Sequence, residues 1–195
     1  KIIQVVKKTN GCMVWGGALD LASADDRIIK IERVLSLDPE GMLLSSIMAK
    51  KKAVNANYVL IDIPVGEEAK IKTKKRARRL KSKFIRLGKK LGMRVRVMIS
   101  NGEQPVGNGV GPALEARDVM SVLAGDGPND LKEKSIKIAG SIFSMVGMWN
   151  GEKKAREILE SGKALEKMQE IIKAQGGKIK EIEVGKFRYS VKSSR

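Results

Sequence analysis

The sequence has no histidine and only one cysteine, Cys12. The absence of histidine excludes Ser-His-Asp and Cys-His catalysis, and it also excludes zinc sites built on histidine. A single cysteine cannot form an internal disulfide bond or a cysteine-rich metal site. Any general acid or base in this chain must therefore be Asp, Glu, Lys, Tyr or Cys12, and we expect no metal site.

Aromatic residues and long apolar runs are also scarce. Only 4% of the residues are Phe, Trp or Tyr, and no apolar run approaches the ~20 residues that a membrane-spanning helix needs. Residues 1–6 do not have the layout of a signal peptide. With 42% hydrophobic and 31% charged residues, the composition is typical of a soluble globular protein. We expect a cytoplasmic location.

Positive charge, in contrast, is abundant. The formal net charge is +17, which implies an anionic partner such as nucleic acid, a phosphorylated metabolite or an acidic protein surface. Fourteen Lys or Arg residues and no acidic residue lie between Lys70 and Arg96. A basic stripe of this kind is typical of a nucleic-acid-binding module, because it neutralises phosphates and releases counterions.

The same stripe is also typical of a solvated outer helix face in an α/β protein, where long basic side chains cover apolar surface. Phe84 is the only aromatic residue in the stripe, and it falls on the apolar side of the predicted helix. No platform for stacking bases is therefore visible. We favour the solvated helix face and keep the nucleic-acid-binding module as an alternative.

A strand-helix-strand unit is predicted in the middle of the chain. Residues 58–63 form a continuous apolar run with one acid, which is typical of a central parallel strand. Thr73 is a plausible cap for the helix that follows, and residues 94–99 form the next strand. The apolar residues of that helix are spaced by three and four, and Gly92 ends it; they are Ala77, Leu80, Phe84, Leu87 and Leu91. We expect an α/β fold with a mixed or mainly parallel sheet and flanking helices.

Other segments give shorter predictions. Residues 2–6 and 13–15 are predicted as short strands, and Pro112 is predicted to open a helix. Further helices are expected over residues 41–52, 131–148 and 152–174, the first of them buried because most of its faces are apolar. The tail over residues 179–191 alternates like strands but is too short to form a sheet alone. We therefore expect that the chain is cut from a longer protein.

Four polar residues and one loop invite functional interpretations. Asp38, in Asp-Pro-Glu, is explained by a helix N-cap with proline at the first helical position, although an acid kept protonated there could donate a proton. Ser46 and Lys50 share one face of an apolar helix. Lys70 follows a central strand, where ligands of parallel sheets bind, or is simply a surface lysine. Gly107–Gly111 resembles a phosphate cradle, but a tight turn before a helix explains it better.

Four stretches together resemble the thymidine/pyrimidine-nucleoside phosphorylase family, and more closely its archaeal AMP-cleaving branch. They are TNGCMVWGGALDLASADD at 9–26, LSLDPEGMLLSSIMAKK at 35–51, YVLIDIPVG at 58–66 and QPVGNGVGPALEAR at 104–117. The similarity runs from about residue 9 to residue 177 in unbroken order. It is far more specific than any single motif.

The resemblance implies phosphorolysis of an N-glycosidic bond, with AMP and phosphate giving adenine and ribose 1,5-bisphosphate. It implies that Asp38 is the proton donor and that Ser46 and Lys70 contact the nucleotide. Lys50 matches a lysine that contacts the base in thymidine phosphorylases. Thymidine phosphorylases have an arginine that would fall near Ile31 in this sequence. Arg33 is close to that position but does not align with it, and this departure favours AMP over a pyrimidine nucleoside as the substrate. The alternative within the class is a thymidine or uridine phosphorylase.

The resemblance also implies how the chain is organised. Residues 1–177 would be a partial catalytic region, with a small helical-lobe segment at 24–52 and an α/β lobe at 57–177. Residues 178–195 would begin a further domain, and the phosphate-binding segments would lie upstream of Lys1. No cofactor is expected, because phosphate is a co-substrate. We expect a homo-oligomer formed through the helical lobe, no membrane contact, and an isolated fragment without activity.

Overall fold

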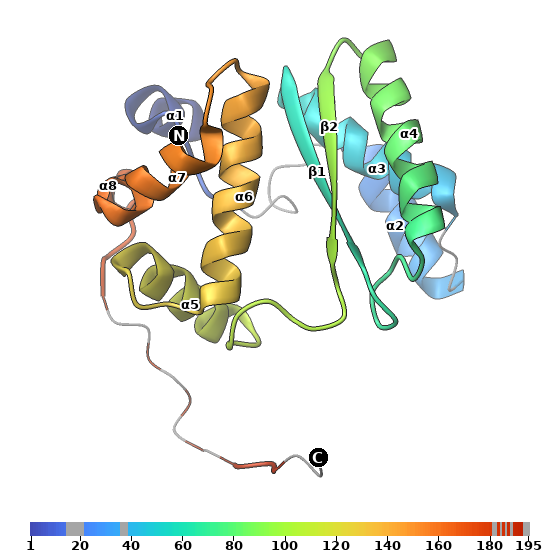
Figure 1. Cartoon of the computed structure of the whole chain (residues 1–195). Coiled ribbons are helices and arrows are strands. Elements are labelled where there is room, and N and C mark those ends of the chain that lie inside the picture. Colours follow the sequence, from blue (N-terminus) through green and yellow to red (C-terminus); the bar gives the residue numbers. More distant parts are fainter. Residues whose placement is uncertain are drawn as a thin grey trace. The chain divides into compact units, whose positions relative to one another are not determined.

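The computed structural model describes residues 1–14, 22–35, 39–180, 183, 185, 187 and 189–192, with only the backbone described at 32, 33 and 35. The elements are α1 (Ile2–Thr9), α2 (Ser23–Leu35), α3 (Glu40–Ala53), β1 (Tyr58–Val65), α4 (Lys74–Lys90), β2 (Arg94–Asn101), α5 (Pro112–Ala124), α6 (Asn129–Met145), α7 (Gly151–Glu160) and α8 (Lys163–Ala174) (Figure 1). The α/β class expected from the sequence is confirmed. None of the helices in these ranges is long and apolar enough to cross a membrane.

The chain divides into two compact units. One unit contains residues 1–12, 106–135 and 156–195, and the other contains residues 13–105 and 136–155. The second unit holds both strands, the helices α2, α3 and α4, and the predicted site residues Ser46 and Lys70.

The two strands of the second unit form a parallel pair. Their register runs from Tyr58 opposite Arg94 to Val65 opposite Asn101. The alternating burial of β1 places Val59, along with Ile61 and Ile63, in the core. Because parallel strands need a crossover, α4 connects them and packs against β2 and β1. The strand-helix-strand prediction is therefore confirmed.

The apolar face of α4 fits the sequence prediction closely. Its buried residues are Ala77, Leu80, Phe84 and Gly88. The predicted cap is confirmed, because the Thr73 hydroxyl oxygen accepts a hydrogen bond from the Arg76 backbone N–H at 3.2 Å. A Cβ atom added at Gly88 would lie 2.1 Å from Cγ2 of Val95, so only glycine allows the helix to approach β2 this closely.

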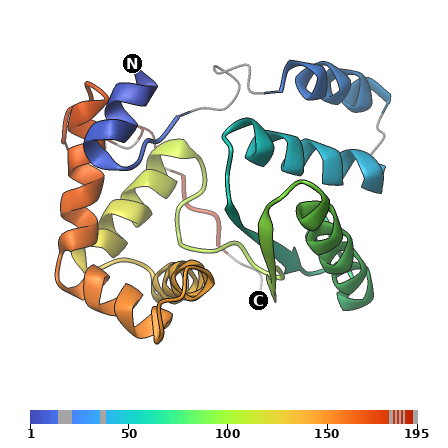
Figure 2. The ribbon, with the colours of Figure 1, turned by 90° about the horizontal axis from the view of Figure 1, so that it is seen from above.

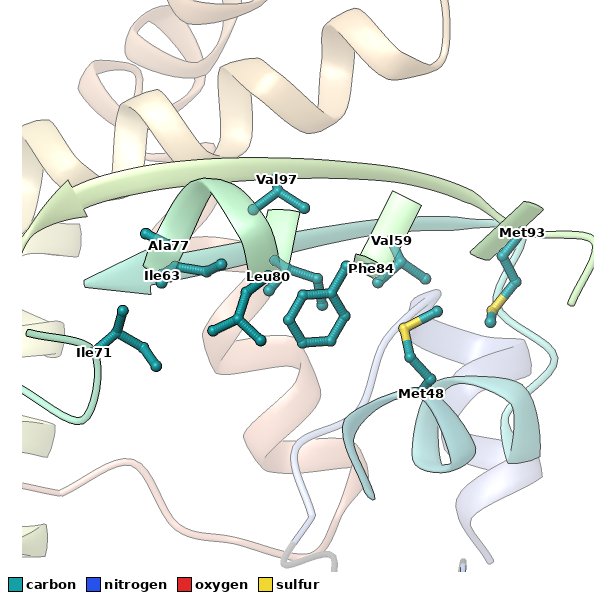
Figure 3. Close-up of a cluster of buried hydrophobic side chains, with 10 residues drawn as sticks. Met48, Val59, Ile63, Ile71, Ala77, Leu80, Phe84, Met93 and Val97 are labelled. Atoms are coloured by element: carbon teal, nitrogen blue, oxygen red, sulfur yellow. The ribbon is translucent and has the colours of Figure 1, made fainter. Parts of the chain in front are cut away.

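A single apolar cluster holds the sheet, α3 and α4 together. Phe84, Leu80 and Met48 are almost completely buried in it, and Figure 3 shows the side chain of Met48, from α3, beside the ring of Phe84. Burying side chains of this size stabilises a fold by roughly 1.5–3 kcal/mol each. The cluster therefore fixes α3, which carries Ser46 and Lys50, against the sheet.

The start of α3 differs from the prediction by one residue. Pro39 has extended backbone angles and occupies the N-cap position, and the helix begins at Glu40. Proline at the first helical position is therefore wrong, and the expected cap residue, Asp38, lies outside the described residues. The helix is also less buried than expected. Met48 is its only buried residue, although α3 packs against both α4 and α2 (Figure 2).

The first segment of the chain was predicted as a strand, and this is wrong. Residues 2–6 belong to α1, in which Val5 and Thr9 are buried four residues apart, a helical spacing. The helix ends at Asn10, whose φ of 59° is left-handed, and it contacts α8. The second short strand, predicted over residues 13–15, is wrong at Met13 and Val14, which have no regular structure. Trp15 lies outside the described residues.

The remaining helices agree with the sequence within a few residues. Pro112 opens α5, and α6, α7 and α8 cover the segments predicted as helical. The tail is different, because those of its residues that the structure describes form no strand. Alternation of apolar and polar residues is not sufficient here, since an isolated strand has no partner for its backbone groups.

Candidate functional site

The candidate site is centred on α3. Asp38, the predicted proton donor, lies outside the described residues, and Glu40 is the first residue of α3. Its carboxylate forms an ion pair with Lys83 of α4 and lies 3.5 Å from Nε of Arg79. These pairs join the first turn of α3 to α4.

The pairs of Glu40 predict a pH-dependent stability. The hydrogen bond from Lys83 is the main cause that holds the pKa of Glu40 below its usual value. A lowered pKa contributes stability above the unfolded-state pKa of about 4.3, and that stability is lost as the pH falls through the folded-state pKa. We expect Glu40→Gln to be less stable than the wild type at pH 7, with the difference vanishing in acid. Urea unfolding of both proteins between pH 7 and pH 3 measures this; a difference independent of pH would contradict it.

Ser46 and Lys50 both meet one buried carboxylate of α2. The Ser46 hydroxyl donates to Oδ2 of Asp25 at 2.8 Å, and Nζ of Lys50 lies 3.0 Å from the same oxygen. Lys50 also lies 3.6 Å from Oδ1 of Asp26. Asp25 is only 8% exposed, so its charge is compensated by these two partners. The prediction that Ser46 and Lys50 share one helix face is confirmed.

The partners of Lys50 keep it charged. The hydrogen bond to Asp25 is the main cause that raises the pKa of Lys50 above its usual value. Lys50 therefore remains an ammonium group at every physiological pH. An ammonium group has three N–H donors, and the side chain of Lys50 is 35% exposed, so a ligand can reach it. A cation fixed on a helix in this way can hold an oxygen or ring nitrogen of a substrate.

Lys70 lies in the loop after β1 and is exposed. It lines a cavity of about 360 Å³ whose walls are mostly apolar. The other lining residues are Leu43, Ile47, Ile61, Asp62, Ile63, Pro64, Ala69, Ile71, Leu80 and Phe84. Leu43 and Ile47 belong to α3, so the helix that carries Ser46 also forms one wall beside Lys70. Apolar walls with a few polar groups are typical of ligand pockets.

Ser46 and Lys70, the predicted site residues that the structure describes, do not line the same described cavity. Lys70 lines the apolar cavity, whereas Ser46 faces α2 through Asp25. A second cavity, of about 620 Å³, lies at the carboxyl ends of the two strands and is lined by Gly66, Lys72 and Asn101 among others. Ligands of parallel sheets bind at this edge. The described part of the site thus consists of α3 and the loops that follow both strands.

The glycine loop at 107–111 is not an open phosphate cradle. Its backbone N–H groups donate to carboxylates of the same chain: Gly107 to Asp130 at 2.9 Å, and Asn108 and Gly109 to Asp118 at 2.6 and 2.7 Å. The Gly107 N–H is the main cause that lowers the pKa of Asp130. A second anion would have to displace these carboxylates. These hydrogen bonds favour the preferred interpretation of a turn before Pro112 over a phosphate cradle, but the expected close packing of that helix on the sheet stays a prediction, since the contact that the structure shows for α5 is with α8.

The basic stripe lies on the outer face of α4. Its inner face is apolar and buried, while most of its cations are exposed. The exposed basic residues of α4 are Lys74, Lys75, Arg78, Arg79, Lys81, Arg86, Lys89 and Lys90. The one aromatic residue of the helix, Phe84, is buried in the core, so it offers no stacking surface for bases. The arrangement favours the solvated helix face over a nucleic-acid-binding module.

Asp25 is the site residue that the sequence did not predict. The pair Asp25-Asp26 is visible in the sequence, but acids in the first turn of a helix are common because they complement the helix dipole. Nothing in the pattern indicates that one of the two is buried. The sequence separation of 21 positions between Asp25 and Ser46 hides the contact, because only the packing of α2 on α3 creates it.

Known proteins resemble the chain over nearly its whole length. The chain is 52% identical to an AMP phosphorylase of Thermococcus kodakarensis over 97% of its residues. It is 51% identical to an AMP phosphorylase of Pyrococcus abyssi over 98% of its residues. A relative from Legionella pneumophila (strain Corby), which bears the provisional name thymidine phosphorylase, is 46% identical over the complete chain.

The same comparisons show that the relatives are longer. The chain spans 39% of the Thermococcus protein, 40% of the Pyrococcus protein and 38% of the Legionella protein. No family model matches the chain. The similarity therefore covers one continuous portion of these proteins and leaves the larger part of each without a counterpart in this sequence.

Proposed function

Because these relatives confirm the resemblance to the thymidine/pyrimidine-nucleoside phosphorylase family, we propose that the chain is the base-side part of a pentosyltransferase. The proposed reaction is phosphorolysis of AMP to adenine and ribose 1,5-bisphosphate. The observation that carries the proposal is the identity of about half to AMP phosphorylases over nearly all of the chain. Since it spans about 40% of those proteins, the activity is proposed for the full-length protein only.

Asp38 is proposed as the proton donor. When phosphate attacks the anomeric carbon, the base leaves with negative charge, and a positioned acid that protonates the base lowers the barrier. The chain has no histidine, so a carboxylic acid is the natural candidate for this role. Asp38 directly precedes Pro39, the N-cap of α3, and the ion pairs of Glu40 hold that helix start in place.

Ser46 and Lys70 are proposed to contact the nucleotide. Ser46 is held toward α2 by Asp25, and Lys70 lines an apolar cavity beside the first two turns of α3. Apolar walls favour a planar base, while hydroxyl and ammonium groups stabilise charge that develops on it during bond cleavage. Lys50, one helical turn after Ser46, is proposed as a further contact to the base.

The remaining partners follow from the same proposal. Phosphate is the co-substrate and no cofactor takes part. The groups that bind phosphate are expected in the part of the protein outside this chain, because the glycine loop is occupied by Asp118 and Asp130. Phosphate-rich substrates also explain a strongly positive chain. A cytoplasmic homo-oligomer formed through the helical lobe completes the proposal.

The substrate is tested directly with the full-length protein. We expect that kcat/KM for AMP exceeds the values for thymidine and uridine by roughly a hundredfold or more, because a site built to hydrogen-bond one base rejects others that leave its groups unpaired. Release of free base in the presence of phosphate, followed by chromatography, measures all three.

The outcomes of this experiment separate the candidates. Preference for thymidine or uridine would establish the pyrimidine alternative. Absence of base release from all three substrates would remove the phosphorylase assignment altogether. Omitting phosphate is the control, since base release that continues without phosphate would indicate hydrolysis.

A further inference from the structure

One carboxylate oxygen of α2 binds both polar side chains that α3 is proposed to use. Oδ2 of Asp25 accepts from the Ser46 hydroxyl at 2.8 Å and lies 3.0 Å from Nζ of Lys50. Asp25 is 8% exposed, whereas the side chain of Lys50 is 35% exposed. The anion is thus buried, whereas its partners are partly exposed. A ligand can therefore reach Ser46 and Lys50 rather than Asp25.

The simplest explanation of such a carboxylate is an ion pair that joins two helices. An ion pair, however, needs only a cation and an anion. A buried ion pair is also weak evidence for stability, because desolvation offsets much of the attraction. Here the same oxygen takes a hydroxyl and an ammonium from positions four residues apart on α3. Both are side chains that the proposed function places against the base.

The contact also decides what Ser46 can offer a ligand. A serine hydroxyl has one proton and two lone pairs, and an ionised carboxylate only accepts. Since the proton of Ser46 goes to Asp25, Ser46 faces a ligand as a hydrogen-bond acceptor. Lys50 can only donate. One turn of α3, about 5.4 Å long, therefore presents an acceptor beside a donor, which fits a base edge that has a donor beside an acceptor.

We propose that Asp25 is a positioning residue, which orients the Ser46 hydroxyl and the Lys50 ammonium so that they bind the base of the substrate. This inference rests on the proposed function, because it assigns Asp25 to the same site. Asp25 itself does not touch the substrate. Its removal therefore acts through Ser46 and Lys50, and it weakens substrate binding more than it slows the chemical step.

The first test compares Asp25→Asn with the wild type in the full-length protein. Asparagine has nearly the same shape but no charge, and its amide can donate to Ser46, which reverses the direction of that hydrogen bond. We expect KM for AMP to rise roughly tenfold or more, the loss expected for one charge-assisted hydrogen bond, with a smaller change in kcat. Initial rates of adenine release over a range of AMP concentrations measure both constants.

Glu133→Gln is the matched control. Glu133 of α6 also ties two helices, through two contacts of 2.9 and 2.8 Å to Arg156, and it is not part of the proposed site. We expect its KM to remain within about twofold of the wild type, because an ion pair of this kind affects only stability. Thermal unfolding of both variants shows how much each loses in stability. A KM increase as large for Glu133→Gln as for Asp25→Asn would overturn the inference.

A double-mutant cycle separates positioning from a general loss of structure. If Asp25 acts through Ser46, Asp25→Asn should raise KM much less in a Ser46→Ala background than in the wild type, because neighbouring groups of one network are not additive. Equal effects in both backgrounds, together with equal effects in a Lys50→Met background, would overturn the inference. Should Asp25→Asn fail to fold, Asp25→Glu is measured in its place, since it keeps the charge and displaces it by one methylene.

The inference and the proposed function fail in different ways. If the wild type releases no base from AMP, thymidine or uridine, the proposed function is wrong and the positioning role is wrong with it. If the wild type cleaves AMP but Asp25→Asn and Asp25→Glu keep the wild-type KM, only the role of Asp25 is wrong. A raised KM with coupling to Ser46 supports both.

Discussion

Asp38→Asn is expected to lower kcat for AMP by about 10²–10⁴ in the full-length protein, the usual contribution of a general acid. The departing base then carries its negative charge without protonation. KM should change little, because the substrate contacts assigned to Ser46 and Lys70 are kept. Single-turnover rates of adenine release measure the chemical step, and steady-state rates give KM. A kcat within threefold of the wild type would remove Asp38 from catalysis.

The choice of asparagine separates proton donation from a purely local hydrogen-bonding role, because asparagine keeps an acceptor oxygen but cannot donate an acidic proton. Since Pro39 is the N-cap of α3, Asp38→Asn and Asp38→Ala should both leave the free energy of unfolding nearly unchanged. A role as proton donor predicts that kcat is lowered in both variants. A ribose 5-phosphate substrate with a nitrophenolate leaving group provides the second control, because a leaving group that needs no proton should restore most of the rate.

Phe84→Ala is expected to lower the free energy of unfolding by about 3–5 kcal/mol, the range measured for deletion of large buried side chains. Phe84 is 1% exposed and lies in the cluster that joins α4, the two strands and Met48 of α3. Its loss leaves a cavity where these elements meet. Since natural domains are stable by only about 5–15 kcal/mol, the variant should unfold at a markedly lower urea concentration.

The neighbouring residue supplies the control for this prediction. Ile85 is 42% exposed on the outer side of the same helix, so Ile85→Ala changes the same kind of side chain without opening a cavity. We expect a loss below about 1 kcal/mol, because it removes only part of the burial of an apolar side chain. Similar losses for the two variants would contradict the packing described for α4.

The strand-helix-strand unit was predictable because its periodicities are clear. A continuous apolar run, a helix with apolar residues spaced by three and four, and a second strand follow one another with a capping threonine and a terminal glycine between them. Each signal is local, and the structure reproduces β1, α4 and β2 nearly residue by residue. The prediction of a strand at the start of the chain was wrong because its signal is ambiguous. An apolar run as short as residues 2–6 fits a strand as well as a helix, and contact with α8 decides between them.

The candidate site was predictable only where the family resemblance reaches it. Composition and spacing alone favoured ordinary structural roles for Asp38 and Lys70, and the resemblance changed that interpretation. The role of Asp25 remained hidden, because a carboxylate in the first turn of a helix has an adequate local explanation. Only the packing of α2 on α3 brings it to Ser46 and Lys50. Long-range pairing of this kind leaves no periodic trace in a sequence.

The turn at 107–111 has a consequence for protein engineering. Its shape is fixed by Asp118 and Asp130, which lie in the two helices that follow it. A transplant of the five-residue loop into another scaffold would leave its amide groups without these acceptors. The segment to transplant is therefore the complete stretch from Gly107 through Asp130, because the helices in it supply the carboxylates that hold the loop in its conformation.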